Sequence, residues 1–576
     1  MKQLLVYLKK YKKECVLAPL FKMLEACFEL IVPLVVAAMI DRGIGKEDQG
    51  YAVRMCLVLI GLGLVGLAAS LTAQYFAAKA ATGFAKELRH SLFSHLLGLS
   101  FTEIDRMGTS TMITRMTSDV NQAQTGVNMF LRLFLRSPFV VLGAMLMAFT
   151  IDIRTALVFV LIIAVLSIAV FLIMRISIPR LKNVQSRLDE VLLGIRENLL
   201  GVRVLRAFCK KKEEDEQFEK KNTALYYGQK KAGFISALLN PLTVVLINAA
   251  IARLIYVGAI RVENGMLTQG QVVALYNYMT QILVELIKFA NLIVTMNKSL
   301  ASARRIADAF EVENSMEDAM EGYGQEEKAE AFAVEFCDVS FRYHGAGKEA
   351  LSGISFAAKE GETIGIIGGT GSGKSTLVNL IPRFYDATGG SVRIHGKDVR
   401  AFHQKTLRER IGIVLQKAVL FQGSIGENLH WGNEFATDEE MMEAVEAAQA
   451  KDVVEKKGGF SGNISQEGRN LSGGQRQRLG IARALVRRPE ILILDDSSSA
   501  LDYATDKKLR SAVSKLSWNP VTFIVSQRTS SIQHADQILV LEDGRMVGHG
   551  KHEELLKTCE VYREIYETCT NQGKEA

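Results

Sequence analysis

Apolar residues gather in long runs in the N-terminal half of the chain and in short runs in the C-terminal half. A helix that crosses a membrane needs about 20 mostly apolar residues. Six stretches of the N-terminal half meet this requirement. We predict membrane spans at residues 15–40, 55–78, 129–150, 155–177, 237–260 and 271–295. The pattern therefore predicts a helical membrane domain over residues 1–310.

The side of the membrane that holds the termini follows from the number of spans and the flanking charges. An even number of spans places both termini on one side. Four lysines precede the first span: Lys9, Lys10, Lys12 and Lys13. Cytoplasmic flanks of membrane helices carry an excess of Lys and Arg. We therefore predict a multi-pass protein of the cell's inner (plasma) membrane, with both termini and the C-terminal domain in the cytoplasm.

The two long connections on the predicted cytoplasmic side are residues 79–128 and 178–236. They are charged, lack the Gly/Ser-rich or Pro-rich composition of linkers, and show helical alternation. We expect them to continue the spans into the cytoplasm as helices. Within them, Asp105–Asp119 and Gly201–Glu214 are the turn-containing segments that we expect to reach the C-terminal domain.

Several charged residues lie inside the predicted spans. Lys22, Glu25 and Glu29 fall on one helical face of the first span. A charge that faces lipid costs several kcal/mol, so this face should point to protein or water. Pairing between Lys22 and Glu25 is the favoured interpretation, and a polar substrate path is the alternative. The same question stays open for Arg253, Glu285 and Lys288.

Composition excludes two classes of protein. The net charge of +7 and the pI of about 8.8 could indicate nucleic-acid binding. Many of the basic clusters lie beside apolar runs, however, so they indicate membrane flanks and no nucleic-acid partner. The seven cysteines are odd in number and form no CxxC pair. Neither a disulfide framework nor a zinc site is therefore indicated.

The C-terminal half begins after an acidic linker, residues 311–330, and the domain that follows covers residues 331–572. Within it, the apolar strand Ile364–Ile367 is followed by G-x-x-x-x-G-K-S and then by a helical run. In this context the pattern predicts a P-loop, whose backbone N–H groups surround phosphate oxygens. The residues that we expect to hold ATP there are Gly368, Gly369, Thr370, Gly371, Ser372, Gly373, Lys374, Ser375 and Thr376.

Magnesium is the second expected cofactor. The lysine of a P-loop reaches the β- and γ-phosphates, and the following hydroxyl binds Mg²⁺. These roles fall to Lys374 and Ser375. The strand Ile491–Leu494 ends in Asp495, which fits the carboxylate near Mg²⁺ in such sites.

Further motifs in the same domain resemble those of the ABC transporters. Leu471-Ser-Gly-Gly-Gln475 resembles the signature motif of that family, and it lies between the P-loop and Asp495 as the family requires. Tyr343 resembles the aromatic residue that stacks on adenine. Gln416 resembles the glutamine that contacts Mg²⁺ and senses the γ-phosphate. The resemblance extends over nearly the whole chain, from the N-terminal helix to about residue 568.

The resemblance implies a type IV ABC exporter fold: six membrane helices with long cytoplasmic extensions, fused to an α/β P-loop NTPase domain. Two nucleotide domains of this family pair head to tail, so each ATP lies between one P-loop and the opposite signature motif. The signature residues Ser472, Gly473, Gly474 and Gln475 would then contact ATP held by a second half-transporter.

Two positions depart from the family pattern. Asp496 follows Asp495 where active members have a glutamate that positions the attacking water. Its carboxylate is shorter by about 1.5 Å, and misplacement on that scale costs around 10²-fold in rate. Gln527 replaces the family's switch histidine, and losing such a stabiliser costs about 10²–10³-fold. Either change alone could be neutral drift; together they predict a site that binds ATP but hydrolyses it slowly.

The combination is similar to the degenerate subunit of heterodimeric bacterial multidrug exporters. It implies a partner with Glu and His at the positions of Asp496 and Gln527, where most hydrolysis occurs, and an amphipathic substrate such as a drug or lipid. Two alternatives stay open from the sequence. One is an ATP-binding regulatory or channel-like subunit, and the other is an importer built on the exporter fold, as for some siderophores.

Overall fold

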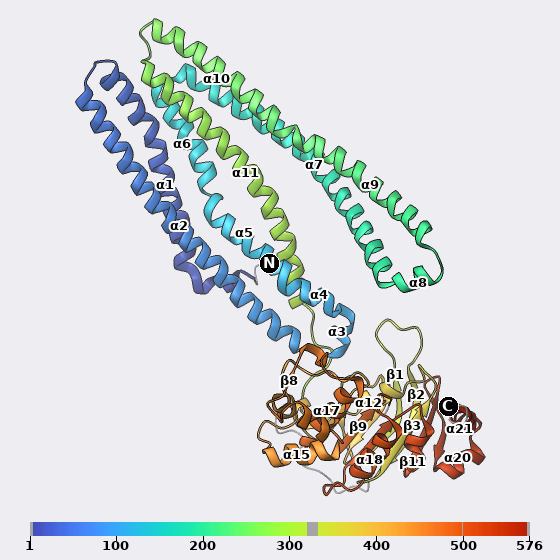
Figure 1. The fold of residues 1–576 in the computed structure, drawn as a ribbon. Coiled ribbons are helices and arrows are strands. Elements are labelled where there is room, and N and C mark those ends of the chain that lie inside the picture. The colour runs from blue at the N-terminus through green and yellow to red at the C-terminus, as the bar shows by residue number, and fades with distance from the viewer. Residues whose placement is uncertain (1–3, 320–331, 498, 573–576) are drawn as a thin grey trace. The chain divides into compact units, whose positions relative to one another are not determined.

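The computed structural model describes residues 4–319, 332–497 and 499–572, and the chain forms two compact units (Figure 1). One unit contains Met1–Leu97 and Ser110–Val312; the other contains Gly98–Thr109 and Glu313–Ala576. Most of the expected acidic linker lies outside the described residues, since 320–331 are not described. The domain boundary predicted near residue 310 differs from this division in one respect. Gly98–Thr109 precedes that boundary but belongs with the C-terminal unit.

Six helical passages of the described chain are long and apolar enough to cross a membrane, which confirms the expected number. The helices of the N-terminal unit are η1 (Leu4–Tyr11), α1 (Lys12–Ala38), η2 (Met39–Ile44), α2 (Gln49–Leu97), α4 (Thr109–Thr114), η3 (Arg115–Asp119), α5 (Val120–Leu133), α6 (Arg136–Ile151), α7 (Ile153–Leu200), α8 (Val202–Ala207), α9 (Lys211–Ala237), α10 (Leu239–Glu263) and α11 (Gln269–Phe310); α8 and α9 lie outside the six passages. Helix α10, which contains the fifth candidate span, begins at Leu239 and has Pro241 in its first turn. The helix is interrupted at Leu238, just before this proline, which lacks the backbone N–H of a continuous helix.

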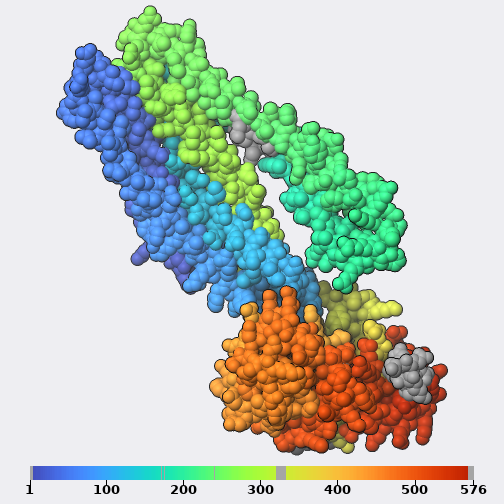
Figure 2. Space-filling view, in the orientation of Figure 1, coloured from blue at the N-terminus to red at the C-terminus, as the bar shows by residue number. Residues whose placement is uncertain are grey.

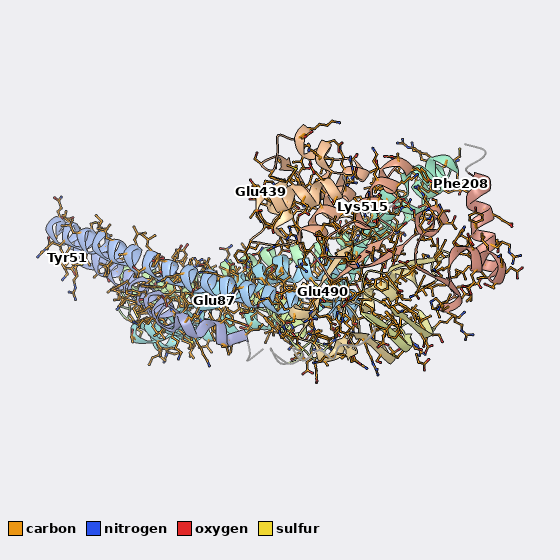
Figure 3. The ribbon with its side chains drawn as sticks, turned by 90° about the horizontal axis from the view of Figure 1, so that it is seen from below. Tyr51, Glu87, Phe208, Glu439, Glu490 and Lys515 are labelled. Atoms are coloured by element: carbon orange, nitrogen blue, oxygen red, sulfur yellow. The ribbon has the colours of Figure 1, made fainter. Side chains whose placement is uncertain are left out.

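Helices α1 and α2 pack along each other through small residues (Figure 1). Ala69, Ala73 and Ala77 of α2 recur every fourth position and are almost fully buried. Small residues at this spacing let two helix backbones approach closely, as membrane helices require. Figure 3 labels Tyr51 near the beginning of α2 and Glu87 well along it. The 49 residues of α2 span about 74 Å, so the helix continues far beyond a hydrocarbon core of about 30 Å.

Helices α7 and α9 form a long hairpin whose tip is the short helix α8. Figure 2 shows an open space between this hairpin and α11 near the α8 end. The second connection expected to reach the C-terminal domain, Gly201–Glu214, lies at this tip. Phe208 there is 72% exposed.

The C-terminal unit contains an antiparallel and a mostly parallel sheet. The antiparallel sheet has the order β2-β1-β4-β5, and the mostly parallel sheet β12-β11-β3-β10-β9-β6. The strands are β1 (Val334–Phe341), β2 (Leu351–Ala358), β3 (Thr363–Gly368), β4 (Gly389–Ile394), β5 (Lys397–Asp398), β6 (Ile411–Val414), β7 (Gly423–Ser424), β8 (Asn463–Ile464), β9 (Ile491–Asp495), β10 (Val521–Val525), β11 (Gln537–Glu542) and β12 (Arg545–Gly550). Strands β7 and β8 form a separate small pair.

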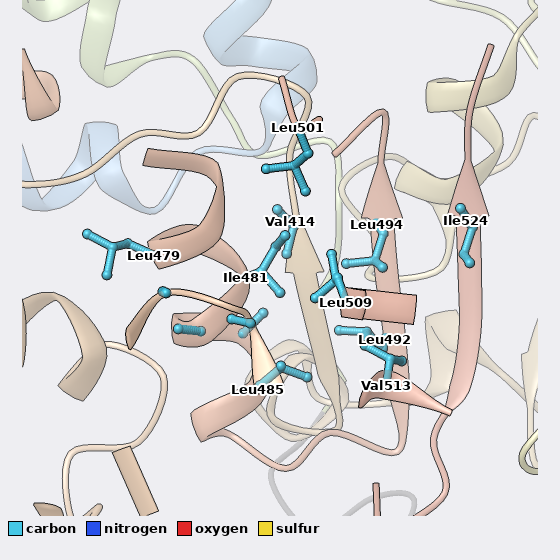
Figure 4. Packing of buried hydrophobic residues seen from close by; sticks show 14 of the residues in the cluster. Val414, Leu479, Ile481, Leu485, Leu492, Leu494, Leu501, Leu509, Val513 and Ile524 are labelled. Atoms are coloured by element: carbon cyan, nitrogen blue, oxygen red, sulfur yellow. The ribbon is translucent and has the colours of Figure 1, made fainter. Parts of the chain in front are cut away.

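The helices of the C-terminal unit complete its core. They are α3 (Phe101–Met107), α12 (Lys374–Leu380), η4 (Val399–Ala401), α13 (Gln404–Glu409), α14 (Ile425–His430), α15 (Asp438–Ala447), α16 (Lys451–Lys456), η5 (Gln466–Gly468), α17 (Gly473–Val486), α18 (Tyr503–Val513), α19 (Thr529–Ile532), α20 (His552–Thr558) and α21 (Glu560–Gln572). Figure 4 shows Ile481 of α17 beside Val414 of β6, with Leu492 and Leu494 on the neighbouring strand β9. All four are almost fully buried. Asp495 at the end of β9 and the loop that follows β3 belong to the site described below.

Candidate nucleotide site

The loop between β3 and α12 ends in a glycine, Gly373, whose backbone conformation and close surroundings leave no room for a side chain. Gly373 has φ +96°, and a Cβ there would lie 2.7 Å from the carbonyl oxygen of Ala350. A side chain would therefore be strained and would clash. The turn holds the loop close to β2 while α12 begins at Lys374.

Lys374 lies buried above this loop. Its Nζ donates hydrogen bonds to the carbonyl oxygens of Gly368 at 2.9 Å and Gly369 at 2.6 Å, and a longer one to Ser372 Oγ at 3.3 Å. These partners are all neutral. Burial lowers the pKa of the Lys374 ammonium, while the charges of Asp496 and Asp495 oppose that shift. The ammonium thus lies in a place that favours an added negative charge.

Two oxygen groups suited to a hard cation meet beneath the loop. Ser375 Oγ donates to Asp495 Oδ1 at 3.0 Å, and Asp495 is 4% exposed. Burial raises the pKa of the Asp495 carboxyl, with Asp496 adding to the shift and the Ser375 bond opposing it. Hydroxyl and carboxylate oxygens are ligands that Mg²⁺ prefers, and substrate phosphates usually complete its shell. Ser375 and Asp495 therefore fit a Mg²⁺ that arrives with a nucleotide.

Many of the expected ATP-binding residues line one cavity of about 340 Å³. Its lining consists of Tyr343, Ala350, Thr370, Gly371, Gly373, Lys374, Ser375, Thr376, Gln416, Asp495, Asp496, Val525, Ser526 and Gln527. Gly368, Gly369 and Ser372 lie beside it as the hydrogen-bond partners of Lys374. Residues separated by more than 180 positions thus reach one place through β3, β9 and β10.

Tyr343 lies at the rim of this cavity. Its hydroxyl is 3.0 Å from Thr376 Oγ1, a contact that the sequence did not predict. Its ring meets Tyr385 edge to face, with 5.4 Å between centroids. The ring is therefore held by neighbours on the side of α12.

Asp496 and Gln527 line the same cavity. Asp496 has φ +47°, an uncommon backbone conformation for a residue other than glycine. Its Oδ2 accepts a hydrogen bond of 3.3 Å from Gln416 Nε2. Burial raises the pKa of the Asp496 carboxyl. Gln527 follows β10 and also lines the cavity.

The signature residues do not line this cavity. Ser472 caps α17 by accepting a hydrogen bond from Gln475 N, while its own N–H donates to Gln475 Oε1 at 2.9 Å. Ser472 and Gly473 are exposed. The beginning of α17 is therefore ordered but open to another molecule.

A short helix, α3, packs within the C-terminal unit although it comes from the N-terminal half. The Phe101 ring lies 4.7 Å from that of Phe384, and Tyr385 donates to Asp105 Oδ2 at 2.7 Å. We predicted Asp105–Asp119 as the contact segment, but the residues that belong with the C-terminal unit are Gly98–Thr109. Helix α2 already ends at Leu97, and α3 begins at Phe101 with Ser100 as its N-cap. Gly98 was the signal that could have located this break.

The charged residues that we expect inside the spans have charged or aromatic partners. Lys22 Nζ lies 2.5 Å from Glu25 Oε2, which confirms the pairing interpretation. Arg136, which the hydropathy pattern does not single out, forms ion pairs with Glu285 at 2.5 Å and Glu29 at 2.6 Å. Lys288 also lies 2.8 Å from Glu285. Arg253 lies over the ring of Tyr256, 5.8 Å from its centroid.

These features define a membrane protein with a P-loop nucleotide domain on the same chain. The family model "ABC transporter transmembrane region" matches residues 15–286, and the model "ABC transporter" matches residues 351–499. The chain belongs to the ABC transporter family.

Three curated relatives illustrate this membership. An uncharacterized ABC transporter ATP-binding protein of Bacillus subtilis (strain 168), YfiB, is 36% identical over 99% of this chain and 98% of its own. Another from Mycobacterium tuberculosis (strain ATCC 25618 / H37Rv) is 34% identical over 97% of this chain and 96% of its own. The ATP-dependent lipid A-core flippase of Yersinia pestis is 29% identical over 96% of this chain and 95% of its own.

Membership has direct consequences for activity. The fold is the exporter type, with six candidate spans and a fused nucleotide-binding domain. The domain binds ATP with Mg²⁺, and the protein is an ATPase coupled to transport across a membrane.

Proposed function

We propose that this chain is the degenerate-site subunit of a heterodimeric exporter that moves amphipathic small molecules, drugs or lipids. The observation that carries the proposal is the composition of one cavity. Lys374, Ser375 and Asp495 are present for binding, whereas Asp496 and Gln527 occupy the positions for hydrolysis. This cavity retains ATP and cleaves it slowly.

The exposed beginning of α17 supplies the second half of the proposal. Ser472 and Gly473 are exposed and lie outside the chain's own cavity. In the heterodimer, Ser472–Gln475 contact ATP in the P-loop of a partner that carries Glu and His at the two altered positions. Most hydrolysis takes place in that partner's site. Tyr343 and Gln416 complete the chain's own site by stacking on adenine and contacting Mg²⁺.

Flanking charge supports the proposed membrane location, and a relative supports the proposed class of substrate. The lysines before α1 favour the cytoplasm for both termini and the nucleotide domain, in the cell's inner (plasma) membrane. A relative named as a lipid A-core flippase supports a lipid or another amphiphile as cargo.

ATPase assays with purified protein test the subunit assignment. The chain alone should turn over ATP about 10²-fold more slowly than the chain assembled with its partner half-transporter. Brisk ATPase activity of the chain alone would overturn the assignment.

Transport assays test the exporter function. Vesicles with outward-facing nucleotide domains and both subunits should accumulate an amphipathic dye in an ATP-dependent, vanadate-sensitive manner. ATP binding that opens a passive pathway would favour a channel-like or regulatory subunit. Movement in the opposite direction would favour an importer.

A further inference from the structure

A groove lies beneath the N-terminal helix η1, within the membrane unit. Its volume is about 680 Å³, which is within the range of ligand cavities. Residues from η1, α1, α2, α5 and α11 line it, and most of the side chains are apolar. The ones that matter here are Leu5, Phe84, Ala123, Val127, Phe130 and Leu131.

Two lysines, Lys9 and Lys12, also line this groove. The acidic side chains nearby already have partners: Glu87 lies 2.7 Å from Lys10, and Glu14 lies 3.0 Å from Lys79. Within the described residues, neither Lys9 nor Lys12 has a carboxylate within 4.0 Å. The groove thus combines an apolar interior with uncompensated positive charge.

The groove lies where lipid can enter it. Helix η1 has exposed apolar residues, Leu5 at 58% and Val6 at 49%, beside its lysines. Short helices of this composition lie in the membrane interface with their apolar face among the acyl chains. Basic residues at the same depth attract anionic headgroups.

We propose that an anionic phospholipid of the surrounding membrane occupies this groove. One acyl chain packs against Phe84, Val127 and Leu131, and the phosphate lies between the ammonium groups of Lys9 and Lys12. The lipid fastens η1 to helices α5 and α11 and is distinct from the cargo. The site does not depend on which subunit hydrolyses ATP.

Charge complementarity sets the expected selectivity. A basic residue near the membrane surface adds about 1 kcal/mol to the binding of anionic lipid, which is about five-fold in affinity. Two such lysines predict a preference of about 25-fold for an anionic over a zwitterionic headgroup. The acyl chain contributes equally in both cases because it contacts only apolar side chains.

A tryptophan reporter in the groove tests this site. Phe130→Trp is introduced into the full-length chain, and the parent protein supplies the background of the natural tryptophans. The protein is reconstituted into phosphatidylcholine vesicles that contain a small fraction of brominated phosphatidylglycerol or, in parallel, brominated phosphatidylcholine. Bromine quenches a nearby indole. Brominated phosphatidylglycerol should quench the reporter at a far lower fraction than brominated phosphatidylcholine.

Charge variants test whether Lys9 and Lys12 bind the anionic headgroup. Lys9→Gln with Lys12→Gln should remove the preference for phosphatidylglycerol, whereas Lys12→Arg should keep it. Lys13→Gln is the matched control, because Lys13 is exposed and does not line the groove. Equal loss in Lys13→Gln and the double variant would overturn the proposal in favour of general surface charge.

A filling variant tests the acyl chain. Ala123→Phe places a ring in the groove and should reduce quenching by both lipids. Equal quenching by the two lipids in the parent reporter would overturn the proposal. So would displacement of both by a neutral amphipathic dye, which would assign the groove to the cargo.

Discussion

Two regions of the molecule bury positive charge, and they treat it differently. In the membrane unit, Arg136 is 5% exposed and lies within 2.6 Å of the carboxylates of Glu285 and Glu29. In the nucleotide unit, Lys374 is 9% exposed and its hydrogen bonds go to neutral groups. The carboxylates of Glu285 and Glu29 neutralise the arginine. The hydrogen bonds of Lys374 go to neutral groups, so its positive charge can be neutralised by a bound anion.

The difference follows from the cost of removing charge from water. A buried ion recovers that cost only from an opposite charge with good geometry. A buried ion pair is therefore consistent with a structural role. A buried charge that is hydrogen-bonded only to neutral groups indicates a site for a charged ligand. For Glu285, which the sequence left between packing and a substrate path, the contacts with Arg136 and Lys288 favour packing.

The largest expected effect is a loss of stability when the ion pairs of Arg136 in the membrane unit are broken. Arg136→Ala leaves Glu285 buried with only Lys288 as a charged partner, and breaking a buried pair costs about 3–5 kcal/mol. Thermal unfolding in detergent should show a correspondingly large loss of stability. Arg253→Ala is the control, since Arg253 lies over an aromatic ring and should lose no more than about 1 kcal/mol. Similar losses in both variants would contradict the distinction.

The second effect concerns hydrolysis in the nucleotide cavity. Asp496→Glu combined with Gln527→His should raise the ATPase rate of the chain alone by about 10²-fold, because a longer carboxylate reaches the attacking water. Single-turnover cleavage of bound ATP measures the chemical step directly. Asp496→Asn, which cannot act as a base, should leave the slow parent rate nearly unchanged. A sharp fall in that variant would show that Asp496 already supports hydrolysis.

A smaller effect tests whether Lys374 is held for a ligand. Lys374→Met should weaken ATP binding about 30-fold, which corresponds to the roughly 2 kcal/mol of a charged hydrogen bond. The stability of the ATP-free protein should stay the same or rise, because a buried ammonium is removed. Isothermal titration and thermal unfolding provide the two readouts. Lys451→Met, at a surface pair with Glu446, should change neither; a loss of ATP-free stability in Lys374→Met would contradict the comparison.

The sequence predicted features whose signal is local. The six spans and the P-loop depend on runs of neighbouring residues. The number of candidate spans is confirmed, and the family model of the nucleotide domain covers the P-loop. Arg136 was missed because Glu285 lies 149 positions away, and hydropathy within one helix carries no sign of that partner. The grouping of Gly98–Thr109 with the nucleotide unit was missed for the same reason, since Tyr385 is distant in sequence from Asp105.

The smallest expected change in stability concerns the exposed hydrogen bond between the Tyr385 hydroxyl and the Asp105 carboxylate. Tyr385→Phe removes the hydrogen bond to Asp105 but keeps the aromatic packing near Phe101. Because water can replace the lost hydroxyl, the cost should be about 1 kcal/mol, or roughly five-fold in local opening. Hydrogen exchange of the α3 amides should report this change, while Tyr503→Phe, at an exposed position of α18, should leave α3 unaffected. A loss as large as that expected for Arg136→Ala would show that exposure does not decide the energy of these contacts.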